Sequence, residues 1–382
     1  MINILKTGIR QHFIVYVLLF LCFGSSQAEP RKVVLNPASG PASGPASDAE
    51  LSVNQIYNKA IRSVVWILTK SGEGSGVLID QELRFVVTNH HVVPDTEEPV
   101  VVIFPVRDKD GKLIEEQTFY RDERNHRVLL QLGYATLARV IAKDAKKDLA
   151  ILELDGLPET ARAINFATPL INPAPGGNKV HIIGNPEGKL WRWTAGFFAG
   201  RDKGMLRINA GTYGGNSGGP VLNANGKLTG IVTLSNKQTE TLAVPVEDVN
   251  NVLRTLEPRY IFSIKNETEI TITFHVKWVE DDDWEKVVIE PGYTTIRWRT
   301  SRIMSSDQQN KHQILDLVDR VPDGYPQVHF DDIFNDRQRI YSLKTQLRYF
   351  GSDIEDSAIG SGYRYYFDYN SLTQTVFLRE KQ

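Results

Sequence analysis

The glycine-rich stretch from Gly214 to Pro220 is the feature that most constrains this chain. It reads Gly-Gly-Asn-Ser-Gly-Gly-Pro. Glycine adopts positive φ without steric cost, so this loop can bend sharply and expose the hydroxyl of Ser217. Backbone N–H groups in such a loop can converge on one point and hold the oxyanion that forms when a hydroxyl attacks a carbonyl. The stretch therefore predicts a nucleophilic serine, which needs a base, usually a histidine, and a carboxylate to orient that base.

Candidates for both partners precede the loop. His90 and His91 follow an apolar strand pattern, and Asp148 stands directly before the apolar run 149–154. Side chains at the ends of buried strands can reach a shared cleft, and from the residues alone either histidine qualifies as the base. Asp144 is a rival carboxylate, but it lies among lysines and is interpreted as a solvated charge.

Four motifs in this order resemble those of trypsin-like serine proteases, most closely the Deg/HtrA-type bacterial branch. Any one of them alone would be a weak signal, whereas the ordered set is specific. The resemblance covers roughly residues 50–258. The motifs read Gly74-Ser75-Gly76-Val77-Leu78-Ile79, Thr88-Asn89-His90-His91-Val92, Asp148-Leu149-Ala150-Ile151-Leu152 and Gly215-Asn216-Ser217-Gly218-Gly219.

The resemblance implies a serine endopeptidase built as a chymotrypsin-like double β-barrel. His91, which directly precedes Val92, aligns with the family's catalytic histidine, so the implied catalytic residues are His91, Asp148 and Ser217. The N–H groups of Gly215 and Ser217 would form the oxyanion hole. No metal-ligand spacing or phosphate loop is present, so we expect no cofactor and no metal.

Trypsin-like folds also imply where a substrate side chain would bind. The corresponding positions here are Gly211, Thr212, Val232 and Ala243. These residues would form a small, mostly apolar pocket. A substrate carboxylate buried there without a cation would cost several kcal/mol, whereas a small aliphatic side chain would be stabilised. We therefore expect cleavage after small or medium aliphatic residues.

The remainder of the first 258 residues shows many short strand patterns separated by turns, which is typical of an all-β fold. Within it, Val100–Val106 and Leu113–Phe119 predict a hairpin around Asp110-Gly111, and the charged stretch Arg121–Arg127 predicts an exposed loop. After Pro258 the pattern changes to alternating strands, which predicts a separate β-sandwich-like domain over residues 259–382. The Deg/HtrA branch usually carries a PDZ domain here, but its glycine-led loop is not found.

The first 28 residues have the pattern of a signal peptide. Lys6 and Arg10 precede the apolar run Phe13–Phe23, and Ser26-Gln27-Ala28 offers small residues for cleavage. An uncleaved membrane anchor is the alternative. Residues 29–49 form a Pro/Ala/Ser/Gly-rich linker without core-forming side chains. We expect an exported, periplasmic or secreted protein, with no stable membrane insertion after cleavage.

Charge does not indicate a nucleic-acid partner. The net charge of −2 would become −4 on removal of the two positive charges of the signal segment, and neither value favours binding to phosphates. The expected partners are protein or peptide substrates. Two other functions stay open: a non-catalytic peptide-binding or chaperone module on a protease scaffold, and a partner- or substrate-binding role for the C-terminal domain.

Overall fold

The computed structural model describes most of the chain between residues 51 and 381. No helix among these described residues has both the length and the apolar character needed to cross a membrane. The predicted signal segment (1–28) and linker (29–49) lie outside them. The described residues are 51–70, 72–94, 98–167, 169, 177–186, 189–236, 239–280, 282–300, 326–332, 335–348, 350, 363–370 and 375–381.

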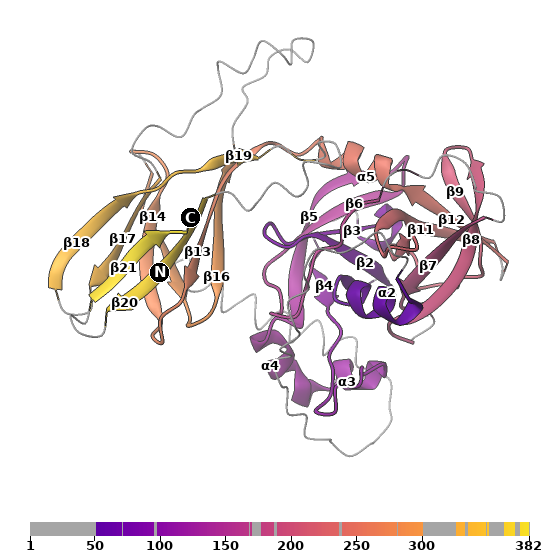
Figure 1. Cartoon of the computed structure of the whole chain (residues 1–382), viewed down its shortest axis with the longest axis horizontal. Helices are drawn as coiled ribbons and strands as arrows, with labels where there is room; N and C mark the ends of the chain where they lie inside the picture. Colours follow the sequence, from indigo (N-terminus) through magenta and orange to yellow (C-terminus); the bar gives the residue numbers. More distant parts are fainter. Residues whose placement is uncertain are drawn as a thin grey trace, which may run out of the picture. The chain divides into compact units, whose positions relative to one another are not determined.

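The chain divides into two compact units between Leu253 and Arg254. The first unit contains two closed six-stranded barrels, drawn from indigo to orange in Figure 1. The second unit consists of two further sheets. This arrangement confirms the predicted all-β fold, with a chymotrypsin-like double barrel followed by a sandwich-like region.

The first barrel is built from strands rich in β-branched residues, which favour a pleated, buried surface. Every residue of the strand Val64–Leu68 is buried, and so is every residue of Leu149–Leu154. The barrel encloses one apolar cluster. In sheet order its strands are β1 (Val64–Leu68), β2 (Glu73–Asp80), β3 (Phe85–Thr88), β6 (Leu149–Leu154), β5 (Ala135–Asp144) and β4 (Val100–Ile103).

The second barrel has the same closed form and its own apolar cluster. Helix α5 (Val246–Leu253) follows its last strand, and helix α2 (Val53–Ala60) precedes the first barrel in the chain. Ser52 caps α2 in a reciprocal capping box with Gln55. The strands in sheet order are β10 (Pro220–Leu222), β11 (Leu228–Asn236), β12 (Glu240–Pro245), β9 (Met205–Asn209), β8 (Arg192–Asp202) and β7 (Asn178–Gly184).

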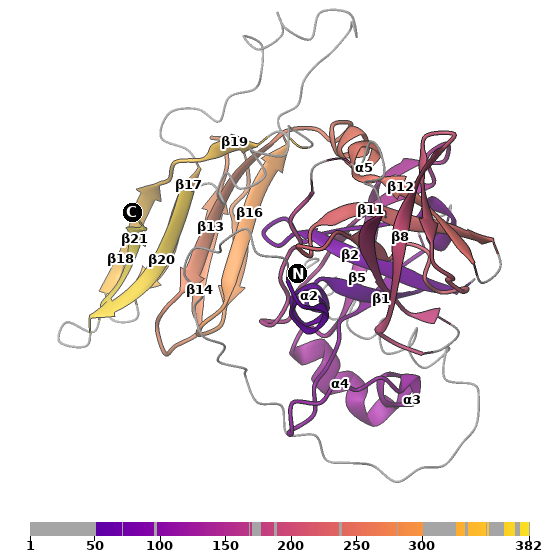
Figure 2. The same ribbon diagram turned by 45° about the vertical axis from the view of Figure 1, so that its right-hand side comes forward.

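The predicted hairpin turn at Asp110-Gly111 is present, closed by an antiparallel bridge between Arg107 and Leu113, but the predicted strand 113–119 and loop 121–127 are wrong. Two short helices, α3 (Gln117–Arg121) and α4 (Glu123–Gln131), occupy this region and lie together on one side of the barrels in both ribbon views (Figures 1 and 2). Asp122 caps α4, whose charged residues face outward while Leu129 is buried. A helix buries one face only, so a charge-rich stretch does not have to be a loop.

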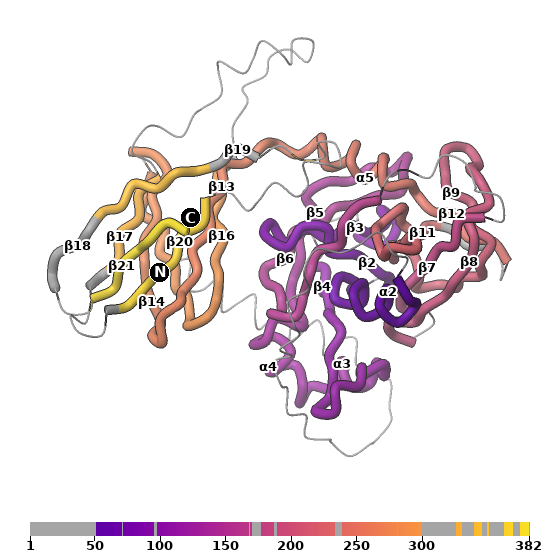
Figure 3. Tube along the Cα trace, in the orientation of Figure 1, coloured from indigo at the N-terminus to yellow at the C-terminus, as the bar shows by residue number. Residues whose placement is uncertain are grey.

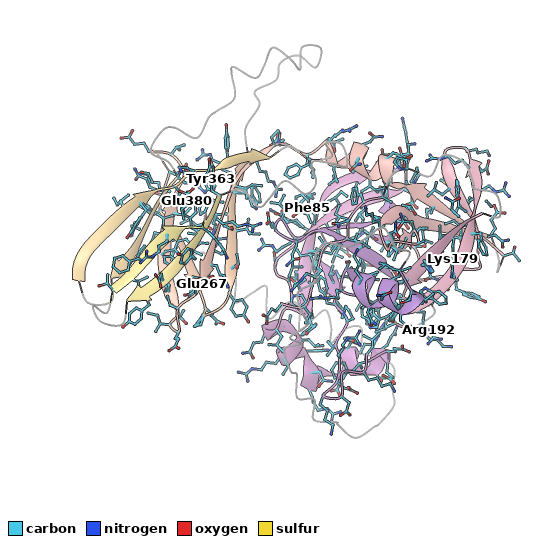
Figure 4. All side chains as sticks on the ribbon, in the orientation of Figure 1. Phe85, Lys179, Arg192, Glu267, Tyr363 and Glu380 are labelled. Carbon is cyan, nitrogen blue, oxygen red and sulfur yellow. The ribbon has the colours of Figure 1, made fainter. Side chains whose placement is uncertain are left out.

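Tyr120 connects this helical insert to both barrels. Its buried ring meets Trp66 of β1 and Trp191, which precedes β8, edge to face. Its hydroxyl donates to the carbonyl of Ile114 at 2.9 Å and accepts from the N–H of Val106 at 3.0 Å. At the surface, Arg192, labelled in Figure 4, lies 3.3 Å from a carboxylate oxygen of Glu115, which precedes α3.

The second unit is a sandwich of two sheets around one apolar cluster. The strand β14 alternates buried and half-buried residues, as its sequence predicts. Strand β13 (Arg259–Asn266) does not show this alternation, yet it lies inside its sheet between β16 and β20 (Tyr363–Asn370). Figure 3 shows yellow β20 beside orange β13, with which it pairs in parallel. One sheet contains β16 (Thr294–Thr300), β13 (Arg259–Asn266), β20 (Tyr363–Asn370), β21 (Thr375–Glu380) and β19 (Gln346–Arg348). The other contains β15 (Glu285–Ile289), β14 (Ile272–Lys277), β17 (Gln327–Asp332) and β18 (Asn335–Ser342).

Candidate active site

His91 and Asp148 meet at one edge of the first barrel. His91 lies in the single turn η1 (His90–Val92) that follows β3, and Asp148 directly precedes β6, which pairs with β3. Nδ1 of His91 is 2.8 Å from Oδ2 and 3.0 Å from Oδ1 of Asp148. The backbone N–H of His91 also donates to Oδ1 at 3.1 Å. Of the two neighbouring histidines, His91 is therefore the one that the carboxylate of Asp148 orients.

The backbone around Asp148 is held in an unusual conformation. Its φ is +54°, a left-handed value that side-chain-bearing residues seldom adopt. The tight turn from β5 produces this bend, and Asp144 stabilises the turn by accepting the N–H groups of Lys146 and Lys147. The buried side chain of Asn89 donates to the carbonyl of Asp148 at 2.9 Å. These contacts direct the carboxylate of Asp148 toward His91.

Thr233, on β11 of the second barrel, completes the surroundings of the carboxylate. Its hydroxyl donates to Oδ2 of Asp148. Burial is the largest single influence on the pKa of Asp148 and raises it, but the hydrogen bonds from His91 and Thr233 act in the opposite direction. Together they hold the pKa of Asp148 below its ordinary value, so the group is a carboxylate at neutral pH. A charged carboxylate is what stabilises an imidazolium.

Ser217 lies in the loop Gly214–Pro220, here called the nucleophile loop. Its hydroxyl donates to the carbonyl oxygen of Thr233 at 3.3 Å. Among the described residues, the Ser217 hydroxyl has no hydrogen bond to His91. A change in the side-chain torsion of Ser217 is therefore needed before its proton can reach the imidazole. Such bonds are often unmade in proteases without a substrate and form in the complex.

The N–H groups of Gly215 and Ser217 in the nucleophile loop have no partner among the described residues. A turn closes the loop, with the N–H of Asn216 donating to the carbonyl of Tyr213 at 3.1 Å. Gly215 stands third in this turn with φ +93°, the sign that a type II turn requires there. Asn216 itself is buried, and its Nδ2 donates to the carbonyl of Tyr213 at 3.3 Å.

The four predicted pocket residues occupy neighbouring parts of the second barrel. Thr212 is buried, and its hydroxyl is 2.9 Å from that of Thr241. Val232 and Ala243 are directly opposite each other on β11 and β12, and both belong to the apolar cluster of the barrel. Gly211 is half-buried just before the nucleophile loop. Every one of these residues is uncharged.

Thr233 is a residue of the site that the sequence does not predict. Its only signal in the sequence is a hydroxyl residue directly after Val232. Its partner Asp148 lies 85 residues earlier, and nothing local to either residue indicates their pairing. The described part of the chain holds no group of three or more His, Cys, Asp or Glu residues arranged to bind a metal ion.

Two barrels with this site between their strands define the trypsin-like class. Residues 74–231 match the trypsin-like peptidase domain, and this region is such a domain. The curated relatives that it resembles are HtrA-like serine proteases. A "Serine protease HtrA-like" protein of Staphylococcus aureus (strain bovine RF122 / ET3-1) is 24% identical over 210 residues, covering 49% of this chain and 24% of that protein. Its counterpart in strain MRSA252 is 23% identical over 240 residues, covering 53% of this chain and 27% of that protein.

The chain thus spans about a quarter of the length of the curated relatives that it matches. Two solved structures are also similar. Rv3671c from M. tuberculosis H37Rv, in an inactive form, is 24% identical with a TM-score of 0.39, covering 56% of this chain and 95% of that one. The serine endoprotease from Yersinia pestis is 24% identical with a TM-score of 0.40, covering 59% of this chain and 73% of that one.

Proposed function

We propose that this protein is an exported serine endopeptidase that cuts peptide bonds through an acyl-enzyme. The observation that carries the proposal is the imidazole of His91 held at 2.8 Å by Asp148, together with a serine loop in which the N–H groups of Gly215 and Ser217 have no partner among the described residues. The HtrA-like relatives support the same reaction class. The reaction requires nothing beyond these side chains, the loop and water.

In the proposed reaction, the Ser217 hydroxyl turns from the Thr233 carbonyl toward Nε2 of His91. Its oxygen attacks the substrate carbonyl carbon while His91 takes the proton. The negative charge that develops on the carbonyl oxygen is stabilised by the N–H groups of Gly215 and Ser217. His91 then gives the proton to the departing amine, which leaves an ester on Ser217. A water molecule, deprotonated by His91, hydrolyses that ester.

The substrate preference follows from the uncharged residues behind the loop. Gly211, Thr212, Val232 and Ala243 present no cation to a substrate carboxylate and no anion to a substrate lysine or arginine. Small or medium aliphatic side chains fit this environment best. The N-terminal signal pattern supports export to the periplasm or the medium.

A direct test uses the purified full chain with a fluorophosphonate probe and denatured casein. We expect the probe to label Ser217 and the casein to be cleaved, with both lost in Ser217→Ala. Labelled peptides are identified by mass spectrometry. A correctly folded protein that neither takes up the probe nor cleaves casein would instead favour a non-catalytic peptide-binding module.

A further inference from the structure

Ser75, on β2 of the first barrel, contacts the nucleophile loop through its backbone and its side chain. Its N–H donates to the carbonyl of Ser217 at 2.8 Å. Its hydroxyl donates to the carbonyl of Gly215 at 2.6 Å. Its own carbonyl accepts the hydroxyl of Thr88 at 2.7 Å, which ties β2 to the strand that leads to His91. One fully buried residue thus holds two carbonyls of the loop.

Asn185, just after β7 of the second barrel, holds the same hydroxyl from the other side. Its backbone N–H and its Nδ2 donate to Oγ of Ser75 at 3.0 and 3.1 Å. A serine hydroxyl has one donor and two acceptor positions, so all three are used. Asn185 is itself fixed, because Nδ2 also donates to the carbonyl of Val65 and Oδ1 accepts the N–H of Trp191.

The glycines of the nucleophile loop fit closely against these two residues. A β-carbon on Gly215 would lie 2.2 Å from the carbonyl oxygen of Asn185. One on Gly218 would lie 2.0 Å from the carbonyl oxygen of Ser75. Both glycines also have positive φ, +93° and +85°. Their lack of side chains lets the loop approach Ser75 and Asn185 closely enough for the hydrogen bonds to form.

We infer that Ser75 and Asn185 are positioning residues that hold the nucleophile loop with its N–H groups directed at the reacting oxygen. The N–H and C=O groups of one residue are separated by only two dihedral angles, φ and ψ. Fixing the carbonyls of Gly215 and Ser217 therefore restrains the N–H groups of the same two residues. This inference rests on the proposed endopeptidase function, and neither residue touches the substrate.

The test compares Ser75→Ala with Ser63→Ala in the full chain. Ser63 is a matched control because it is also buried and donates its hydroxyl to a backbone carbonyl, that of Arg162 at 2.6 Å. Losing one oxyanion donor typically costs about a hundredfold to a thousandfold in rate. Because Ser75→Ala loosens donors without removing them, we expect kcat to fall about tenfold to a hundredfold. KM should change little, and Ser63→Ala should keep the wild-type kcat.

A transition-state analogue separates positioning from general damage. A peptide boronate forms a tetrahedral adduct on the serine, so its affinity should fall in Ser75→Ala by the same factor as kcat/KM. Asn185→Ala should shift both quantities in the same direction by a smaller factor, which provides a second variant if Ser75→Ala folds poorly. An unchanged kcat, a rise in KM alone, or an equal loss in Ser63→Ala would overturn the inference.

Amide hydrogen exchange tests the positioning role of Ser75 independently of the proposed peptidase activity. Amides in the peptide covering residues 211–219 should exchange faster in Ser75→Ala than in wild type, and Ser63→Ala should leave them unchanged. This measurement needs no turnover. A wild-type protein without activity would end the endopeptidase proposal, whereas unchanged exchange in Ser75→Ala would end the positioning role even in an active enzyme.

Discussion

Thr233 donates its hydroxyl hydrogen to Oδ2 of Asp148, which links the second barrel to the carboxylate that orients His91 in the first. The same residue accepts the hydroxyl of Ser217 through its backbone carbonyl. Thr233 therefore contacts two of the three proposed catalytic residues. Movement between the two barrels would disturb the contact with Asp148, because Thr233 and Ser217 both belong to the second barrel.

The first prediction concerns stability and pH. The folded pKa of Asp148 is lowered, so its contribution to stability is present above the unfolded value of about 3.9 and is lost as pH falls through the folded value. Thr233→Val removes a hydrogen bond to a charged group and should cost about 2 kcal/mol of unfolding free energy at pH 7. The cost should shrink below about pH 4.

The matched control for this prediction is Thr229→Val. Thr229 is buried on the same strand, and its hydroxyl donates to the neutral carbonyl of Val221 at 3.0 Å. The loss of unfolding free energy in Thr229→Val should therefore be the same at pH 7 and pH 3. Denaturant unfolding at pH 7 and pH 3 measures both variants, and a Thr233→Val cost that does not change with pH would contradict the account of Asp148.

The second prediction concerns the catalytic unit. Ser217→Ala and His91→Ala should each remove most peptidase activity, and the double variant should lose little more, because residues that act as one unit are not additive. His90→Ala should be much milder, since Asp148 contacts His91. Steady-state kinetics on a peptide substrate give kcat and KM for the three single variants and the double variant. Strong loss in His90→Ala with activity kept in His91→Ala would reverse the assignment.

The third prediction concerns specificity. Cut sites mapped by mass spectrometry in an unfolded protein should follow small or medium aliphatic residues. Burying such a side chain contributes roughly 1–2 kcal/mol, whereas an unpaired charge in the same place is costly. A dominant preference for glutamate, or for lysine and arginine, would be incompatible with a pocket formed by Gly211, Thr212, Val232 and Ala243.

The fourth prediction concerns the helical insert. Tyr120→Phe leaves the buried N–H of Val106 and the carbonyl of Ile114 without the tyrosine hydroxyl, so we expect a loss of about 1–3 kcal/mol in unfolding free energy. Tyr213→Phe is the control, because that side chain is exposed. Thermal or denaturant unfolding of the two variants compares them directly, and equal stability would mean that the insert does not depend on this hydroxyl.

The fifth prediction concerns the two units. A chain ending at Arg259 keeps both barrels and α5 and omits the sandwich. We expect it to be soluble and to react with a fluorophosphonate probe at the rate of the full chain, because every contact described around Ser217 comes from the first unit. Insolubility of the shorter chain alone would show that the barrels need the second unit.

The sequence by itself determined the parts of this protein whose signal is local. Alternating or continuous apolar runs predicted the barrel strands and strand β14, because the order of apolar and polar residues within one strand indicates which of its side chains are buried. The loop Gly214–Pro220 indicated its conformation because only glycine tolerates the dihedral angles that it needs. The pairing of His91 with Asp148 was expected from ordered motifs, not from either residue alone.

Only the tertiary structure decided which distant residues meet. Ser75 and Gly215 are 140 residues apart, and Thr233 and Asp148 are 85 apart. A serine or threonine has the same local pattern whether its hydroxyl faces water or a catalytic loop. The motif around Ser75 therefore did not identify its partner, and nothing around Thr233 did so either. The helix Glu123–Gln131 was missed for a related reason. Its charges indicated exposure correctly, but packing of its buried face, not the charges, decides that it is a helix.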